Sequence, residues 1–299
     1  MLLKKVHQEV DVLGKKVAVI TGASRGIGLE MAKELAAREY KVIMACRDKE
    51  KAACLAGEMI NNQRTLDVEV LTVNMASLQS IKAFCVKFTG MHNRLDVLLN
   101  NAGVFCDRLQ RTEDGFEMTM GVNYLGPFFM TRLLLPALQN APAARVINVV
   151  SKAAFHAKLK LNDQLFTADT HGFKAYAASK LAQILFTIDL AEELKGTGVT
   201  VNAAYPGRVA TDIWKGSSLL MKVVAPVMMR NSISAAEGAK TGIFLAASPE
   251  LEGVSGKLYY FEDILEYNQA CLDEQLRKKL MMRSFDAVNL PQPASLTQP

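Results

Sequence analysis

The sequence lacks the cysteine spacing of a disulfide framework or of a structural zinc site. Its five cysteines, Cys46, Cys54, Cys85, Cys106 and Cys271, are odd in number and include no CxxC pair. No histidine lies beside them, so they do not form the usual ligand set of a zinc site. We therefore expect free thiols, no metal site, and a reducing, cytoplasmic compartment.

Long apolar runs and an excess of charge of one sign are also missing. The most apolar late stretch, residues 217–229, is broken by Lys222 and Pro226 and is shorter than the roughly 18 apolar residues of a membrane span. Charged side chains interrupt residues 1–16, which predicts neither a signal peptide nor a membrane anchor there. The formal charge of +5 is spread along 299 residues without a basic stripe, which argues against nucleic-acid binding.

Short β-branched runs alternate with longer amphipathic segments between Lys16 and Phe261. This alternation predicts repeated βα units, and hence an α/β fold with a parallel sheet that helices cover on both faces. The expected strands are residues 16–21, 41–45, 69–73, 97–100, 145–150, 200–204 and 256–261. The expected helices are residues 27–39, 48–61, 77–88, 116–139, 176–194 and 234–247.

The domain organisation follows from the absence of a linker within this alternation. One domain is expected over residues 1–287, with its core at about residues 14–262 and a C-terminal extension beyond it. The tail, residues 288–299, has three prolines among small polar residues and is expected to be disordered.

A glycine-rich turn, TGASRGIG at 21–28, separates the first expected strand from the first expected helix. Gly22 permits the tight turn, while Gly26 and Gly28 let backbone amides and the helix approach a pyrophosphate group. Such turns often only end a strand, but the strand before this one and the helix after it favour phosphate binding.

The second expected strand ends in Cys46 and Arg47, where an NAD site would place a carboxylate on the ribose 2′-hydroxyl. A guanidinium favours a 2′-phosphate instead, and Arg25 in the glycine turn offers a second one. Arg47 could alternatively pair only with Asp48 or Glu50. The two arginines predict NADP(H).

Tyr176 and Lys180 lie four residues apart in a helical pattern, so their side chains share one face. A phenol has a pKa near 10, and an adjacent ammonium lowers it by favouring the phenolate. The pair then becomes a usable general acid and base. Alone, a Tyr-x-x-x-Lys pair is more often a turn of a surface helix, so its meaning depends on the motifs around it.

Six motifs in order make the sequence resemble the short-chain dehydrogenase/reductase family. They are TGASRGIG at 21–28, NNAG at 100–103, Asn123 in VNYLG, Ser151 after VINVV, YAASK at 176–180, and PG at 206–207. The stretches ACRDKEKA, VNYLGPF and SKLAQILFTIDLAEELKGTGVTVNAAYPG are most like retinol dehydrogenase-like and carbonyl reductase members. The resemblance implies a doubly wound Rossmann fold of about seven parallel strands, and hydride transfer between nicotinamide and a carbonyl or alcohol.

The resemblance also assigns roles to residues of this chain. Tyr176 would exchange a proton with the substrate oxygen, while Lys180 would hold the nicotinamide ribose and lower the pKa of the tyrosine. Ser151 would donate a hydrogen bond to the same oxygen, and Asn123 would hold a water that relays protons. The remaining residues implied in cofactor binding are Gly22, Ser24, Arg25, Gly26, Ile27, Gly28, Arg47, Asn74, Met75, Asn101, Ala102, Gly103, Pro206, Gly207, Val209 and Thr211.

Three departures from the family pattern bear on this assignment. Asn74 stands where an aspartate usually faces the adenine, and its oxygen can still accept that bond. Lys152 follows Ser151 where a small or hydroxylated residue is more usual. The segment 152–174 is longer than in the shortest members, as in retinol dehydrogenase-like proteins.

Substrate and assembly are the least determined features. Apolar side chains in residues 214–229 suit a lipophilic aldehyde or ketone, although such residues at helical spacing also pack against a core. The helices 116–139 and 176–194 are the family's usual association surface, which predicts a homodimer or homotetramer. The competing function is a catalytically quiet nucleotide-binding regulatory protein, whose signature would be loss of Tyr176 or Lys180.

Overall fold

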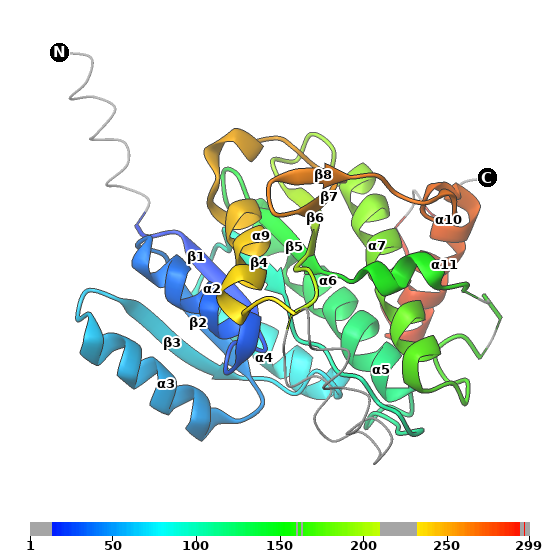
Figure 1. The fold of residues 1–299 in the computed structure, drawn as a ribbon, viewed down its shortest axis with the longest axis horizontal. Helices are drawn as coiled ribbons and strands as arrows, with labels where there is room; N and C mark the ends of the chain where they lie inside the picture. Colours follow the sequence, from blue (N-terminus) through cyan, green and yellow to red (C-terminus); the bar gives the residue numbers. More distant parts are fainter. Residues whose placement is uncertain (1–13, 160, 163, 210–231, 294–295, 297–299) are drawn as a thin grey trace.

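An eight-stranded sheet forms the centre of the protein (Figure 1). The computed structural model describes residues 14–159, 161–162, 164–209, 232–293 and 296. The strands are β1 (Val17–Thr21), β2 (Lys41–Cys46), β3 (Asp67–Thr72), β4 (Val97–Asn100), β5 (Arg145–Val149), β6 (Thr200–Tyr205), β7 (Leu258–Tyr260) and β8 (Asp263–Leu265). Their order is β3-β2-β1-β4-β5-β6-β7-β8, with β8 antiparallel to β7 and the other pairs parallel.

This order confirms the predicted doubly wound α/β fold, and its parallel part has the seven strands that were expected. The eighth strand, β8, was not predicted. It returns from β7 through Phe261, whose φ of 53° lies in the left-handed region. The turn between β7 and β8 therefore rests on a backbone conformation that few non-glycine residues adopt.

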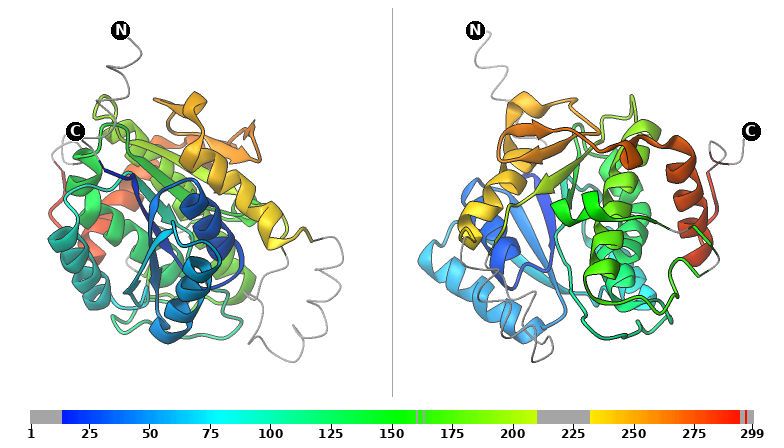
Figure 2. Two further views of the ribbon diagram at one scale, coloured as in Figure 1. Left: turned by 90° about the vertical axis from the view of Figure 1, so that its left-hand side faces the viewer. Right: turned by 45° about the vertical axis from the view of Figure 1, so that its right-hand side comes forward.

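Helices cover both faces of the sheet (Figures 1 and 2). One face carries α2 (Gly26–Ala37), α3 (Lys49–Asn62) and α9 (Ala235–Ala247), and the other carries α4 (Leu78–Met91), α6 (Gly126–Gln139) and α7 (Gly172–Glu193). The shorter elements are α5 (Met118–Met120), η1 (Gly121–Leu125), η2 (Lys152–His156), η4 (Pro249–Leu251) and α10 (Gln269–Leu272), followed by the longer α11 (Glu274–Ala287).

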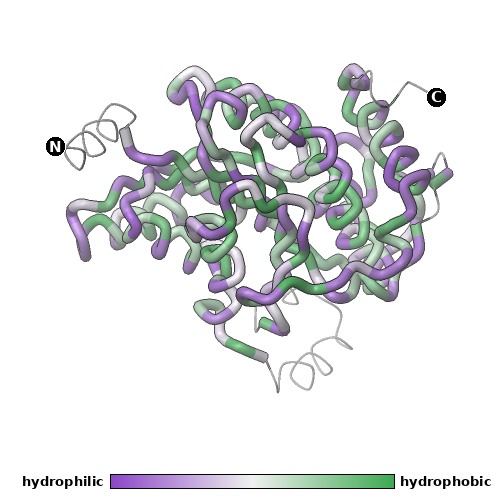
Figure 3. The backbone as a smooth tube through the Cα atoms, turned by 90° about the horizontal axis from the view of Figure 1, so that it is seen from above, coloured by the Kyte–Doolittle hydropathy of each residue, from purple (hydrophilic) through white to green (hydrophobic). Residues whose placement is uncertain are grey.

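The central strand β1 shows why the sequence forms this layered core. Val17 and Val19 pack into the cluster beneath α4, α6 and α7, whereas Ala18 and Ile20 pack into the cluster beneath α2, α3 and α9. All five residues of β1 are buried, as a parallel strand covered on both faces requires. The hydrophilic segments lie mostly around the periphery (Figure 3).

The structure differs from the expected helices in three places. The expected helix 116–139 is interrupted by η1, a π-helical turn that carries Asn123. Helix α7 begins at Gly172, four residues before the expected position 176. The helices α10 and α11 were not assigned from the sequence at all.

In the part of the chain that the structure describes, no helix combines the length and apolarity needed to cross a membrane.

Helix α11 packs across α7 and covers part of the expected association surface. The Tyr124 hydroxyl lies 2.6 Å from the Ser284 hydroxyl, and the rings of Phe128 and Phe285 are 5.1 Å apart. Val288 is buried directly after the helix, and Leu290 packs against the same core. Packing against the core therefore continues to Val288 and Leu290, directly after α11.

Candidate active site

Strands β1 and β4 are neighbours at the centre of the sheet, and the strand order reverses between them. From β1 the chain adds β2 and β3 toward one edge, and from β4 it adds β5 to β8 toward the other edge. In open parallel sheets, ligands bind at the carboxyl ends of the strands at such a switch point. The glycine turn follows β1, the NNAG segment follows β4, Ser151 follows β5, and the PG pair follows β6. The fold thus brings four of the six predicted motifs to one edge of the sheet.

The glycine turn has the geometry that a phosphate group requires. Gly22 and Gly26 adopt φ values of 68° and 53°. A Cβ at Gly28 would lie 2.4 Å from Asn101 Nδ2 and 2.5 Å from Gly22 O, so only glycine fits there. Arg25, the residue that precedes α2, makes no side-chain capping bond, which leaves the first backbone amides of the helix free of a side-chain cap. These amides and the helix dipole fit a pyrophosphate.

Thr21 joins the two turns, and reasoning from the sequence did not single it out. Its hydroxyl accepts hydrogen bonds of 3.0 Å from the backbone amides of both Asn101 and Ala102. The Asn101 side chain returns a bond of 2.9 Å to Thr21 O. The NNAG segment is therefore held against the end of β1. The signal was present, because Thr21 is the first residue of the TGASRGIG motif.

The expected adenosine end of the site lies after β2. The Ser24 hydroxyl bonds the Cys46 thiol, which places the glycine turn beside the end of that strand, and Arg47 follows as an exposed side chain. Asp48 caps α3 by accepting a 3.0 Å bond from Lys51 N. Among the described residues, no carboxylate lies within 4.0 Å of Arg47, so the alternative pairing is not observed.

Asn74 and Met75 follow β3 and differ in their surroundings. Asn74 Oδ1 accepts a 3.1 Å bond from Ala76 N, while its Nδ2 donates a 3.0 Å bond to Glu113. Met75 is buried against α6, where a Cβ on Gly126 would lie 3.1 Å from Met75 Cε. The Met75 side chain thus belongs to the core, and only its backbone is left to face a ligand.

Tyr176 and Lys180 meet Ser151 above the end of β5. Tyr176 is 9% exposed and hydrogen bonded with Ser151, whose hydroxyl also accepts a 3.2 Å bond from Ala153 N. Lys180 is 4% exposed, and its Nζ lies 5.8 Å from the centre of the Tyr176 ring. The structure therefore brings the three residues together as the motifs predicted.

The electrostatics of this pair depart from the expectation. Burial raises the pKa of Tyr176 to about 12, and the hydrogen bond with Ser151 opposes part of this rise. Burial lowers the pKa of Lys180 to about 7. The expected lowering of the tyrosine pKa by the lysine is not observed, because burial governs the pKa of both groups by removing water from the phenolate and from the ammonium. At neutral pH the phenol carries its proton and can donate it.

Asn123 is held by the π-helical turn η1. Its Oδ1 accepts a 2.8 Å bond from Val104 N, and its Nδ2 donates 3.0 Å bonds to Val104 O and to the Ser179 hydroxyl. A Cβ at Gly103 would lie 3.5 Å from Asn123 Oδ1 and 3.8 Å from Lys180 Nζ. The missing side chain at Gly103 therefore keeps a small space beside both groups.

The PG pair forms the remaining wall of the site. Gly207 has a φ of 82°, and a Cβ there would lie 3.0 Å from Ile233 Cδ1. Val209 pairs with Ile233 in a parallel bridge. The Lys152 ammonium lies 5.2 Å from the centre of the Tyr205 ring, next to this wall. Thr211 and the apolar stretch 214–229 lie outside the described residues.

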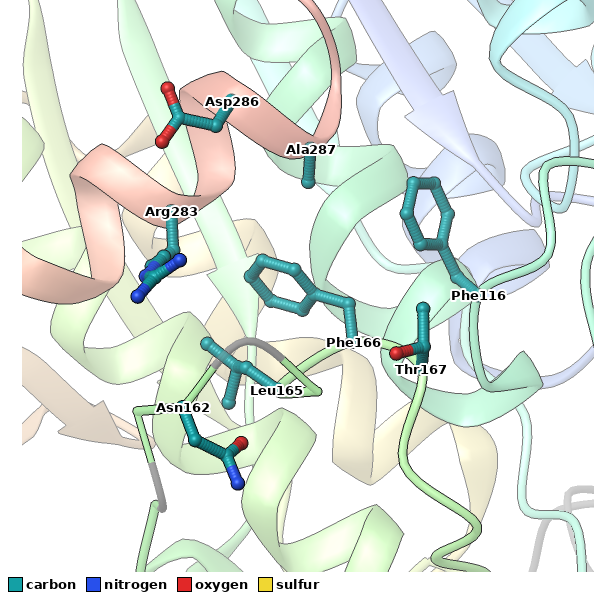
Figure 4. Close-up of a pocket in the computed structure, with 8 residues that line it drawn as sticks. All are labelled: Phe116, Asn162, Leu165, Phe166, Thr167, Arg283, Asp286 and Ala287. Atoms are coloured by element: carbon teal, nitrogen blue, oxygen red, sulfur yellow. The ribbon is translucent and has the colours of Figure 1, made fainter.

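A separate pocket of about 280 Å³ lies between the elongated segment after Ser151 and helix α11 (Figure 4). It is lined by Phe116, Asn162, Leu165, Phe166, Thr167, Arg283, Asp286 and Ala287. None of the predicted site residues lines it. The elongated segment therefore packs on α11 on this side.

Comparisons with known proteins agree with this geometry. A family model described as short chain dehydrogenase matches residues 16–219. Human retinol dehydrogenase 14 is 39% identical over 90% of this chain and 82% of its own length. Human retinol dehydrogenase 12 is 42% identical over 83% of this chain and 78% of its own length.

Solved structures show the same architecture. An uncharacterised protein from Mycobacterium paratuberculosis is 28% identical with a TM-score of 0.75, covering 94% of this chain and 96% of that one. A short chain dehydrogenase from Salmonella enterica is 22% identical with a TM-score of 0.68, covering 85% and 98%, and supports the fold alone.

Proposed function

This chain belongs to the short chain dehydrogenase family, and we propose that it is an NADP(H)-dependent oxidoreductase that transfers a hydride between nicotinamide and a carbonyl or alcohol. The observation that carries the proposal is the grouping of buried Tyr176 and Lys180 with half-buried Ser151, at the edge of the sheet where the glycine turn also lies. A bound nicotinamide would supply or accept the hydride. The chain itself supplies orientation and the proton.

Tyr176 acts as the proton donor in carbonyl reduction. Its raised pKa keeps the phenol protonated at neutral pH, and Ser151 bonds its oxygen. Ser151 follows β5, and the hydrogen bond from Ala153 N fixes the position of its hydroxyl. The Ser151 hydroxyl would donate a hydrogen bond to the substrate oxygen that Tyr176 protonates. Lys180 orients the nicotinamide ribose, and Asn123 holds the proton-relaying water near the space beside Gly103. The same groups would serve alcohol oxidation, with the proton moving from the substrate oxygen in the opposite sense.

The proposed preference for NADP(H) rests on the side chains of Arg47 and Arg25. Ser24, in the glycine turn, bonds the Cys46 thiol at the end of β2 and so lies beside the same place. Two guanidinium groups and a hydroxyl suit a 2′-phosphate, and the chain places no acidic residue at position 46 or 47. The other cofactor contacts proposed are those of the glycine turn, the NNAG segment, the backbone near Asn74, and the PG wall with Thr211.

Replacing Arg47 with aspartate tests this preference. A charge-assisted bond to the 2′-phosphate becomes a repulsion, so kcat/KM for NADPH should fall by about ten- to a hundredfold relative to NADH. Arg64→Asp makes the same charge change at an exposed position beyond α3 and should leave the ratio unchanged. An unaltered NADPH to NADH ratio in Arg47→Asp would mean that Arg25 or another group decides.

The proposed substrate is a lipophilic aldehyde or ketone. Two observations support this class: the similarity to proteins named retinol dehydrogenases, and the apolar composition of residues 214–229. The experiment is NADPH oxidation, followed at 340 nm, with retinal, steroid ketones and small xenobiotic carbonyls. Turnover of the bulky apolar members with a low KM is expected, and turnover of small polar aldehydes alone would contradict the class.

The catalytically quiet alternative would give a different result in the same assay. Quenching of tryptophan fluorescence by NADPH without turnover of any carbonyl would support it. The presence of Tyr176, Lys180 and Ser151 in contact argues against it.

All five cysteines are free thiols in the structure, which supports the proposed cytoplasmic location.

Self-association is proposed through the parts of α6 and α7 that α11 leaves uncovered. The C-terminal helix already packs Phe285 on Phe128 of α6 and pairs Arg277 with Glu192 of α7 at 3.0 Å. Light scattering is expected to show a dimer or tetramer. A monomer at all concentrations would mean that α11 takes the place of a partner chain on this surface.

A further inference from the structure

Gln183 lies one turn after Lys180 on α7 and has no role in the site described so far. Its side chain is 1% exposed. Its Oε1 accepts a 2.7 Å hydrogen bond from Lys180 Nζ, and the Val149 carbonyl accepts a second bond of 2.8 Å. Within the described residues, these two oxygens are the acceptors of the buried ammonium.

The orientation of the Gln183 amide is set by the lysine. Its Nε2 is buried and has no hydrogen-bond partner in the described part of the protein. Turning the amide over would place Nε2 against Nζ at the same 2.7 Å, donor facing donor. The observed orientation thus leaves one donor unpaired in order to keep Oε1 on Lys180. A side chain present only to fill space would carry no such cost.

The turn that carries Gln183 is tied firmly to the sheet. The Gln183 carbonyl accepts a 2.8 Å bond from the Thr187 hydroxyl, which accepts a 2.9 Å bond from Asn148 Nδ2 on β5. Asn148 in turn accepts a 2.9 Å bond from Asn100 Nδ2 on β4. This buried series of polar groups fixes the position of Gln183 relative to the strands that end at the site.

We propose that Gln183 is a positioning residue that keeps Lys180 charged and directed beside Tyr176 by accepting a hydrogen bond from its ammonium group. The proposal rests on the proposed role of Lys180. A bond to the charged form of a buried group favours that form. Because burial already lowers the pKa of Lys180 to about 7, loss of this acceptor would lower that pKa further and reduce the charged fraction at neutral pH.

Neighbouring groups do not replace this contribution. The titratable side chain that faces the ammonium is Tyr176 on α7, whose phenol is protonated at neutral pH. The turn η1 contributes Asn123, which carries no charge, and β5 contributes the Val149 carbonyl. Among the residues that the structure describes, no carboxylate lies within 4.0 Å of Nζ.

Two near-isosteric variants separate this role from simple packing. The ε-carbon resonance of Lys180, assigned by its loss in Lys180→Met, is titrated in protein labelled with ¹³C-lysine and without cofactor. Gln183→Met should lower the pKa of Lys180 by about one to two units, since a charged hydrogen bond is lost. Gln183→Glu should raise it, because a carboxylate then faces the ammonium. The high-pH loss of kcat/KM should move in the same direction in each variant.

Thr89→Val is the matched control, because it removes the same kind of bond, from a threonine hydroxyl to the carbonyl four residues earlier, on α4 and away from Lys180. It should leave the Lys180 titration in place. The proposal is overturned if the Met and Glu variants leave that titration unchanged, or if they lower activity equally at every pH. If the titration moves as expected while the wild type reduces no carbonyl, the proposal for Gln183 stands and the proposed function fails.

Discussion

Replacing Tyr176 with phenylalanine should lower kcat by about 10²- to 10⁴-fold while leaving NADPH affinity nearly intact. The phenol is the group that the proposed mechanism assigns as the proton donor to the substrate oxygen. Its pKa is raised by burial to about 12, so it holds that proton throughout the neutral range. Steady-state kinetics and a fluorescence titration with NADPH measure the two quantities separately.

Tyr40→Phe is the control for loss of one phenolic oxygen. Tyr40 is also buried, and its hydroxyl donates a 3.4 Å bond to Ala246 O, away from the site. This variant should keep its turnover. A Tyr176→Phe enzyme with a near-native rate would show that another group supplies the proton, and the assignment of the whole site would be wrong.

Lys180→Met should produce a loss of similar size and should also weaken cofactor binding. The variant removes the ammonium that lies 5.8 Å from the Tyr176 ring and bonds Val149 O and Gln183 Oε1. Ribose orientation and stabilisation of the phenolate during proton transfer are lost together, so kcat/KM should fall by about 10²- to 10⁴-fold. The rate of the residual reaction should no longer depend on pH near 7, the pKa of this lysine.

The sign of the wild-type pH dependence follows from that lowered pKa. Lys180 is charged below about pH 7 and loses its charge as the pH rises through this value. Activity that needs the ammonium is therefore present on the acid side and declines on the alkaline side. Lys174→Met removes an exposed lysine of the same helix and should leave the profile unchanged. An alkaline limb that persists in Lys180→Met would assign the titration to another group.

The motifs predicted most of the site because each one sits where a parallel strand ends. The glycine turn, NNAG, Ser151 and PG follow β1, β4, β5 and β6, so sheet topology alone brings them together. The contact of Tyr176 with Lys180 followed from helical spacing. What spacing could not reveal was the balance of electrostatics, because the pKa values depend on burial by segments distant in the sequence.

The interruption at η1 could not be found from periodicity. Its five residues are all buried, so no polar face marks the change from an α-helix to a π-helical turn. The turn also packs closely on a neighbouring segment, because a Cβ on Gly121 would lie 2.4 Å from Thr112 Cγ2. The side-chain bonds of Asn123 then depend on a backbone shape that its own sequence does not encode locally.

Helix α11 was missed although a signal was present. Arg277, Leu280, Met281, Ser284 and Phe285 are its buried residues, and they recur at the three- and four-residue spacing of one helix face. Its many charged residues hid this stripe. The sequence signal for Gln183 was weaker than that for α11. It consists of one polar residue three positions after Lys180 among apolar residues of the same helix. A buried polar residue at that spacing from a buried lysine indicates a partner.

The most direct measurement follows the transferred hydrogen itself. NADPH carrying deuterium at C4 of the nicotinamide is mixed with the enzyme and an apolar aldehyde or ketone, and the product is analysed by mass spectrometry. Both C4-deuterated stereoisomers are used. The account predicts an alcohol with one deuterium on the former carbonyl carbon from one isomer, formed by the wild type and not by Tyr176→Phe. Binding of NADPH with no deuterated alcohol from either isomer would contradict it.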